Sequence, residues 1–423
     1  MTPTIEATAP TPARNRLLHP DPTVRRLARI TLLNCLGNGL SMTLGVLFFT
    51  RVLGFGAVQV GTALTAAGLC GVLAGVPAGR AADRWGSRRV LVVLVAGEAL
   101  GVAAYTLVHS YPLFVPLACL VMALDRGSAA VRNALYAEVL PADRRVAGRA
   151  YLRVVTNVGI GAGTAVAALV LHADSRGAYV AALLADAVSF AVVAVMYAAL
   201  TVPPRVKAPT VPGERTGNPA LRNRPFLAVT VLSGLLCLQF SVLEVGVPLW
   251  VVEHTEAPRV VVAVSLIANT VLVALLQVRA TRGTEEPTAA ARIFRRGGLL
   301  IAAACLLIGL AHGLPGWLAA VLLIAGVACQ TFSEMYCQAA GWALSYDLAG
   351  DGHHGSYQGV FNAGLSSALM FGPVLITTVV ITNGLVGWIL LGALMLAAAV
   401  AMPPTVRWAQ RTRPDAPVPS VSP

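Results

Sequence analysis

The sequence predicts an all-α integral membrane protein, with twelve transmembrane helices in two pseudo-symmetric six-helix bundles. Three observations predict it: the composition, the length of the apolar blocks and the placement of the basic residues. The chain has 423 residues, of which 57% are hydrophobic and only 12% charged, whereas soluble domains carry about 25% charged residues. Blocks of about 20 apolar residues suit helices that cross a bilayer, and the alternation typical of barrel strands is absent.

Each apolar block is expected to form one helix, and the polar stretch between the sixth and seventh is the longest inside the chain. The expected helices are 27–50, 58–79, 89–108, 113–138, 148–171, 178–200, 226–250, 259–278, 297–312, 316–343, 356–381 and 385–402. The domains that follow are an N-terminal tail (1–26), a first bundle (27–200), a central linker (201–225), a second bundle (226–402) and a C-terminal tail (403–423).

The basic residues predict the orientation. With a cytoplasmic N-terminus, most of the 31 Lys and Arg residues fall on the inside, and the outside loops hold only Arg51, Arg176 and Arg259. Cytoplasmic loops are enriched in basic residues, so we expect a cell-membrane protein with both termini in the cytoplasm. The tail 1–26 lacks the apolar region of a cleaved signal peptide. Because the basic residues flank apolar blocks, we expect the lipid bilayer as a partner and no nucleic acid.

An internal repeat supports the two bundles. A shift of 209 positions places Asp125 on Glu334, Glu138 on Asp347 and Gly163 on Gly372 without a gap. Because alanine and glycine are abundant, some of them match by chance at any shift. Acidic residues are rare inside spans, so a match of one acid within a span and another at its end is less expected by chance. Repeats of this kind are typical of transporters.

The loop expected between the second and third helices carries the most specific motif. It reads Gly-Arg-Ala-Ala-Asp-Arg-Trp-Gly-Ser-Arg-Arg over residues 79–89 and contains Gly79, Asp83, Arg84, Gly86 and Arg88. A plain basic inside loop would explain the arginines but not the spacing of the glycines and the aspartate. The motif resembles the signature loop of the major facilitator superfamily, with Ser87 where that family usually has a basic residue.

The resemblance implies a secondary transporter in which two bundles rock around a central cavity, and it makes residues 79–89 a conformational switch loop. Glycines at positions 159, 161 and 163 are similar to the glycine-rich motif of the bacterial drug/proton antiporter branch, although Thr164 replaces its proline. The stretch from 334 to 359, which includes Gly-Trp-Ala-Leu-Ser-Tyr-Asp over 341–347, is also similar to bacterial efflux transporters.

Charges inside the spans are the candidates for proton coupling, because a charge at mid-membrane is costly and is expected to face a cavity or a partner. The candidates are Asp125, Arg126, Glu244 and Glu334. The structural alternative is an ion pair within a bundle, such as Asp125 with Arg126 or with Arg132.

Four polar or aromatic residues are candidates for the substrate cavity: Asn34, Asn38, Gln239 and Tyr336. Asn34 and Asn38 lie one turn apart on one helix face. Hydrogen bonds between helices, or aromatic residues at the membrane interface, are the plainer explanations.

The favoured function is proton-coupled efflux of a small hydrophobic or amphipathic compound, such as a drug or secondary metabolite, by alternating access. A nutrient importer or uniporter of the same fold stays open, and a non-transporting membrane sensor or enzyme is a remote alternative. The sequence lacks nucleotide-binding, hydrolase and zinc-protease motifs, so we expect no enzyme, no cofactor and no metal site. We expect a monomer.

Overall fold

The computed structural model describes residues 21–141, 144–202, 218–349 and 353–412, and every regular element in these ranges is helical. The N-terminal half contains α1 (Pro22–Leu47), η1 (Phe48–Val52), α2 (Ala57–Trp85), α3 (Ser87–Ala104), η2 (Tyr105–Leu107), α4 (Tyr111–Val139), α5 (Arg145–Ala173) and α6 (Arg176–Ala198). The C-terminal half contains α7 (Pro219–Arg222), α8 (Arg224–Cys237), α9 (Gln239–Ser241), η4 (Val242–Gly246), α10 (Val247–His254), α11 (Val260–Ala280), α12 (Pro287–Leu310), α13 (Gly316–Asp347), α14 (His354–Leu375), η5 (Ile376–Ile381) and α15 (Thr382–Arg411).

In the described part of the chain, eleven segments are long and apolar enough to cross a membrane. The last of them, His354–Arg411, has 58 residues and contains two helices separated at Gly384, where the backbone leaves the helical region (φ 59°, ψ −136°). Counting these two separately gives twelve crossings and confirms the predicted fold class. The final helix continues through Pro403 and Pro404 to Arg411 instead of ending at 402.

The helix boundaries follow from local signals in the sequence. The Asp21 side chain caps α1 by accepting a hydrogen bond from the Thr23 amide at 2.7 Å, and Pro22 occupies the first turn, where a missing amide hydrogen costs nothing. The expected extent of the loop over 79–89 is wrong. Helix α2 continues through Pro77 and Gly79 to Trp85, and the chain turns at Gly86 with φ 91°.

The two halves repeat one packing plan. Helix α1 packs against α5 and α6, as α8 packs against α14 and α15. Helix α4 packs against α2 and α3 as α13 packs against α11 and α12, and the pair α3 and α6 matches α12 and α15. A Cβ added to Gly163 would overlap the Leu36 carbonyl of α1, and one added to its repeat partner Gly372 would overlap Ser241 of α9. The shift of 209 positions therefore corresponds to equivalent places in three dimensions.

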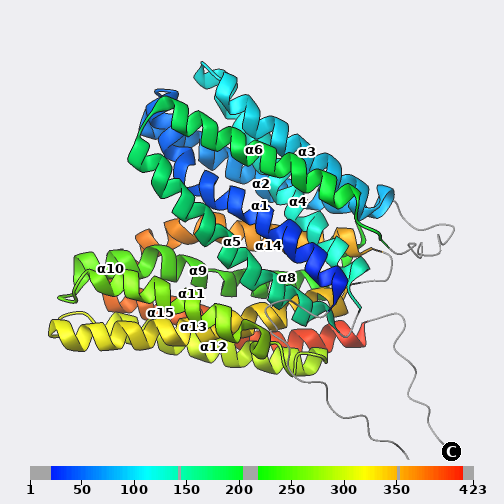
Figure 1. The fold of residues 1–423 in the computed structure, drawn as a ribbon. Helices are drawn as coiled ribbons and strands as arrows, with labels where there is room; N and C mark the ends of the chain where they lie inside the picture. Colours follow the sequence, from blue (N-terminus) through cyan, green and yellow to red (C-terminus); the bar gives the residue numbers. More distant parts are fainter. Residues whose placement is uncertain (1–20, 142–143, 203–217, 350–352, 413–423) are drawn as a thin grey trace, which may run out of the picture.

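The halves form two layers, in which the N-terminal helices lie on one side and α8 to α15 on the other, with α5 and α14 at the boundary (Figure 1). Each half has its own apolar core. A third, small cluster joins them and contains Ala137, Ala150, Trp342 and Tyr346. We call the end at which α2, α4, α6, α11 and α13 finish the linker end, since the central linker leaves α6 there.

Candidate functional site

The helices α2 and α14 meet along a seam of four glycines, Gly75, Gly79, Gly355 and Gly359, which we call the glycine seam. A Cβ at Gly79 would overlap the Gly355 carbonyl, and one at Gly355 would overlap the Gly79 carbonyl. Without side chains, the two backbones approach more closely than any other residue allows. Gly79, a predicted switch residue, is therefore a contact point between the two halves.

Asp83 fastens the linker end of this seam. Its Oδ1 accepts a hydrogen bond from the Gly355 amide at 2.8 Å, and its Oδ2 accepts one from the Ser356 amide at 2.6 Å. These amides belong to the first turn of α14, where backbone N–H groups have no partner in the helix and the helix dipole favours an anion. Asp83 of one half therefore caps a helix of the other, and its role in a conformational switch stays a prediction.

The remaining predicted switch residues act within the N-terminal half or face outward. Arg88 donates a hydrogen bond to the Leu200 carbonyl at 2.9 Å, which ties the start of α3 to the end of α6. Ser87 donates to Glu138 at 2.8 Å and so connects the same turn to α4. Arg84 is exposed and its guanidinium lies 5.7 Å from the Trp85 ring centroid.

Arg149 of α5 makes a second contact between the halves near the linker end. Its Nη1 donates to the Tyr346 hydroxyl at 2.9 Å, and its guanidinium lies 4.8 Å from the Trp342 ring centroid. Asn133 of α4 donates from its side chain to that of Asn362 on α14 at 3.3 Å. The two halves are therefore in contact at the linker end both along the glycine seam and between α5 and α13.

A buried acid near the middle of α13 is the centre of the third contact. The Glu334 side chain is 4% exposed, and its Oε1 lies 3.6 Å from Nη2 of Arg153 on α5. Asn269 of α11 donates to Glu334 at 3.1 Å, Gln338 at 3.2 Å and Gln330 at 3.5 Å. We call these five residues together with Gln239 the Glu334 cluster.

The Glu334 cluster contains one ion pair and several polar atoms without a hydrogen-bond partner in the described part of the chain. Its ion pair joins the two halves, and charges in a low-dielectric setting interact more strongly than they do in water. Several of its buried polar atoms have no hydrogen-bond partner among the described residues: Arg153 Nε, Gln239 Oε1, Gln330 Oε1 and Gln338 Oε1. Unpaired groups at such a place suit a site that receives a polar ligand or water.

The other predicted coupling charges lie outside this cluster. Asp125 forms an ion pair with the adjacent Arg126 at 3.5 Å, with 33% and 37% of the side chains exposed. Glu244 is exposed in the π-helical turn η4, a kind of irregularity that is frequent at functional sites. Among the described residues, Glu334 is the one candidate of the four that forms an ion pair with the opposite half.

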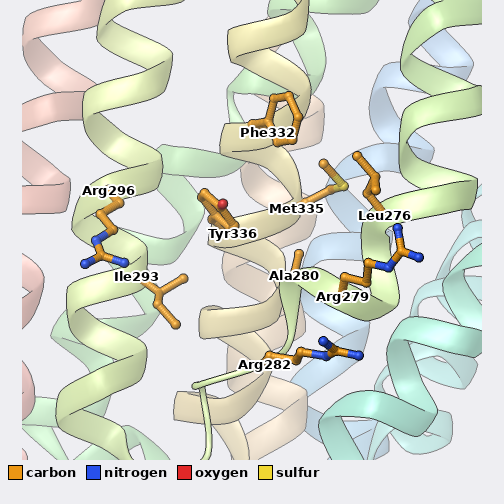
Figure 2. A pocket seen from close by; sticks show the side chains of 9 residues that line it. All are labelled: Leu276, Arg279, Ala280, Arg282, Ile293, Arg296, Phe332, Met335 and Tyr336. Carbon is orange, nitrogen blue, oxygen red and sulfur yellow. The ribbon is translucent and has the colours of Figure 1, made fainter.

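The predicted cavity residues are divided among three places. Gln239 is buried within the Glu334 cluster, where its carbonyl accepts from Gln330 at 3.5 Å. Asn34 is buried and Asn38 half-buried on α1, which packs against α5. Tyr336 lies on another face of α13, in a separate pocket between α11 and α12 (Figure 2).

Sequence reasoning missed Arg153, Asn269, Gln330 and Gln338. A signal was present, because all four are polar residues inside predicted spans, where such residues are costly and mark functional sites. Arg153 lies inside the fifth predicted span, one helical turn beyond Arg149.

Comparisons with known proteins agree with this architecture. The sequence model of the Major Facilitator Superfamily matches residues 27–373. The chain therefore belongs to this family of membrane transporters, and a small-molecule substrate and a lipid environment follow from that membership. A search of curated proteins finds no match.

Several solved structures share the fold at low sequence identity. A bacterial homologue of the iron transporter ferroportin in an outward-facing state gives a TM-score of 0.71 at 14% identity, covering 92% of this chain and 99% of that one. The proton:xylose symporter XylE gives 0.70 at 13%, covering 91% and 96%. The human organic anion transporter TETRAN gives 0.64 at 16%, covering 90% and 100%.

Proposed function

We propose that the protein is a secondary active transporter that exports a small hydrophobic or amphipathic compound in exchange for protons, by alternating access. It acts as a monomer in the cell membrane with both termini in the cytoplasm. The observation that carries the proposal is the ion pair between the half-buried Arg153 and the buried Glu334, because it joins the two halves through a carboxylate that a proton would neutralise.

The ion pair links protonation to movement of the halves. With Glu334 ionised, its attraction to Arg153 favours the arrangement in which α5 and α13 lie close together. A proton on Glu334 removes the negative charge and weakens that attraction, so the halves separate more easily. The released proton then leaves on the side to which the cavity has opened. A ligand can only shift an equilibrium between two states by binding them unequally, and here the proton does so.

The end at which the two halves are in contact also supports alternating access. The described polar contacts between the halves lie at the linker end or near the middle of the helices: Asp83 with α14, Asn133 with Asn362, Arg149 with Tyr346 and Arg153 with Glu334. The positive-inside rule predicts that this end faces the cytoplasm. The arrangement then corresponds to an outward-facing state, which is the state named for the similar ferroportin homologue and for the fucose transporter FucP.

Inverted membrane vesicles with an acidic lumen test the proposal, with the fluorescent amphipathic cation ethidium as the probe. An exporter exchanging protons for cargo accumulates ethidium in the lumen when the pH gradient is imposed and releases it when the gradient is collapsed. Vesicles without the protein provide the background. A gradient-independent signal would contradict proton exchange, and accumulation of xylose in right-side-out vesicles instead would favour an importer.

Three amide substitutions identify the coupling carboxylate. Glu334→Gln is expected to abolish accumulation driven by the gradient, since the amide cannot carry the proton. Asp125→Asn and Glu244→Gln are matched controls that remove one charge within a span, and we expect both to keep it. Gradient-driven transport that survives Glu334→Gln would overturn the assignment.

A further inference from the structure

The pocket that contains Tyr336 is lined by residues of the C-terminal half. It has a volume of 260 Å³ and is formed by α11, α12, α13 and the turn between the first two (Figure 2). Tyr336 is two positions from Glu334 in α13, so the two side chains leave the helix on different faces. The pocket is therefore distinct from the Glu334 cluster.

Three arginines surround this pocket. Arg296 lies on one side of Tyr336 and Arg279 on the other, with Arg282 below them (Figure 2). All three are exposed, and none has an acidic partner within ion-pair distance in the part of the chain that the structure describes. Guanidinium groups without an acidic partner are suited to a phosphate, which they bind through several hydrogen bonds at once.

Apart from the Tyr336 hydroxyl, the rest of the lining is apolar. Leu276 and Ile293 face the pocket from α11 and α12, and Phe332 and Met335 from α13. A pocket with a cationic rim and an apolar wall fits an anion attached to hydrocarbon better than a free anion, because the free anion would leave the apolar wall uncovered. It is also smaller than the roughly 300–1,000 Å³ of pockets for drug-sized ligands.

The depth of the pocket matches the level of lipid headgroups. Helix α11 ends at Ala280 and α12 begins at Pro287, so Arg279 and Arg282 lie at the end of a predicted span and in the turn beyond it. Basic pockets between transmembrane helices on the cytoplasmic side bind anionic headgroups. We propose that this pocket binds the headgroup of an anionic phospholipid, with its phosphate on Arg279, Arg282 and Arg296 and the start of its acyl chains on Phe332 and Met335.

The proposal is tested by thermal unfolding of the full-length protein in a neutral detergent. Short-chain phosphatidylglycerol is titrated, with short-chain phosphatidylcholine and inorganic phosphate as separate arms. A ligand that binds only the folded state raises the melting temperature as its concentration rises. We expect a rise of several degrees with phosphatidylglycerol, and little change with either of the other two at equal concentration.

The triple variant Arg279→Gln, Arg282→Gln, Arg296→Gln is expected to lose this rise. The matched control Arg292→Gln, Arg295→Gln, Arg411→Gln removes the same charge from exposed positions outside the pocket and is expected to keep it. Single substitutions are measured as well, and each is expected to weaken the apparent affinity about threefold to tenfold, which preserves the test if the triple variant does not fold.

Three results would overturn the proposal. An equal rise with phosphatidylcholine would show that the headgroup charge is not recognised, and an equal rise with inorganic phosphate would assign the site to a soluble anion. An equal loss in the control variant would show that total charge matters rather than the pocket. None of these results depends on the transport experiment, so each proposal can fail without the other.

Discussion

The turn after α2 and its equivalent after α11 show how one packing plan serves two different purposes. In the N-terminal half, Asp83 precedes the turn at Gly86 and binds the first turn of α14 in the opposite half. In the C-terminal half, Arg279 lies at the end of α11 and Arg282 in the turn, and both line a pocket within their own half. The repeat fixed the positions of the helices, whereas the residues at their ends decided what each turn contacts.

The two seams between the halves differ in the same way. Helix α2 packs on α14, and its symmetry partner α11 packs on α5. The first is the glycine seam, held by close backbone approach and by Asp83. The second lies beside the Glu334 cluster, in which Asn269 of α11 and Arg153 of α5 both contact Glu334. One seam therefore combines close backbone approach with a capped helix end, and the other contains an ion pair between the halves.

The largest effect is expected at the second seam. Arg153→Met leaves the buried Glu334 carboxylate without its cationic partner, which we expect to lower the free energy of unfolding by about 3 kcal/mol, since removing one member of a buried pair leaves an uncompensated charge. Unfolding in mixed detergent micelles measures it. Adding Glu334→Gln to Arg153→Met should recover part of the loss, and strictly additive losses would mean that the pair is not coupled.

The glycine seam is expected to respond to a single methyl group. In Gly355→Ala the new Cβ meets the Gly79 carbonyl, and overpacking of this kind costs about 1–3 kcal/mol. The closed linker end should become less populated, which spin labels at the exposed positions Trp85 and Trp408 report as a longer distance in a cysteine-free background.

Gly161→Ala is the matched control for that substitution. No atom lies within 4 Å of a Cβ at Gly161, and alanine is the better helix former by roughly 0.5–1 kcal/mol. The distance between the labels should stay unchanged in this variant. A change as large as that in Gly355→Ala would show that close approach at the seam is not what closes the linker end.

A smaller effect is expected at the cap of α14. Asp83→Asn removes the charge but keeps one acceptor oxygen, so the two amides of α14 lose about 1 kcal/mol of stabilisation, a fraction of what a charged acceptor provides. The same spin-label distance should lengthen, though less than in Gly355→Ala. Glu285→Gln is the control from the equivalent turn after α11, where the acid is exposed. If it lengthened the spin-label distance as much as Asp83→Asn does, Asp83 would have no special role in holding the two halves together.

The smallest effect is expected at the repeat partner of Glu334. Asp125→Asn breaks an ion pair of two partly exposed neighbours, and such pairs contribute about 0–1 kcal/mol. The free energy of unfolding in mixed micelles should change by less than it does for Arg153→Met. A loss of about 3 kcal/mol would show that the two equivalent acids are held in the same way after all.

The fold and part of the site could be predicted from the sequence. The length of the apolar blocks predicts the twelve crossings, because the bilayer requires each to satisfy its own backbone. The spacing of Gly79, Asp83 and Gly86 singles out the turn after α2, and the shift of 209 positions pairs Asp125 with Glu334. Arg153 and Asn269 were missed because the pattern within a single helix does not say which helix stands opposite.

The sequence by itself determined that the chain crosses a bilayer in two matched sets of helices, because hydrophobic length and the placement of arginine are local properties. Only the tertiary structure decided which of two equivalent acids became a buried link between the halves. Asp125 pairs with its own neighbour, whereas Glu334 meets Arg153 from another helix. Partners that are distant in the chain are set by how helices pack, and that depends on side chains from both halves at once.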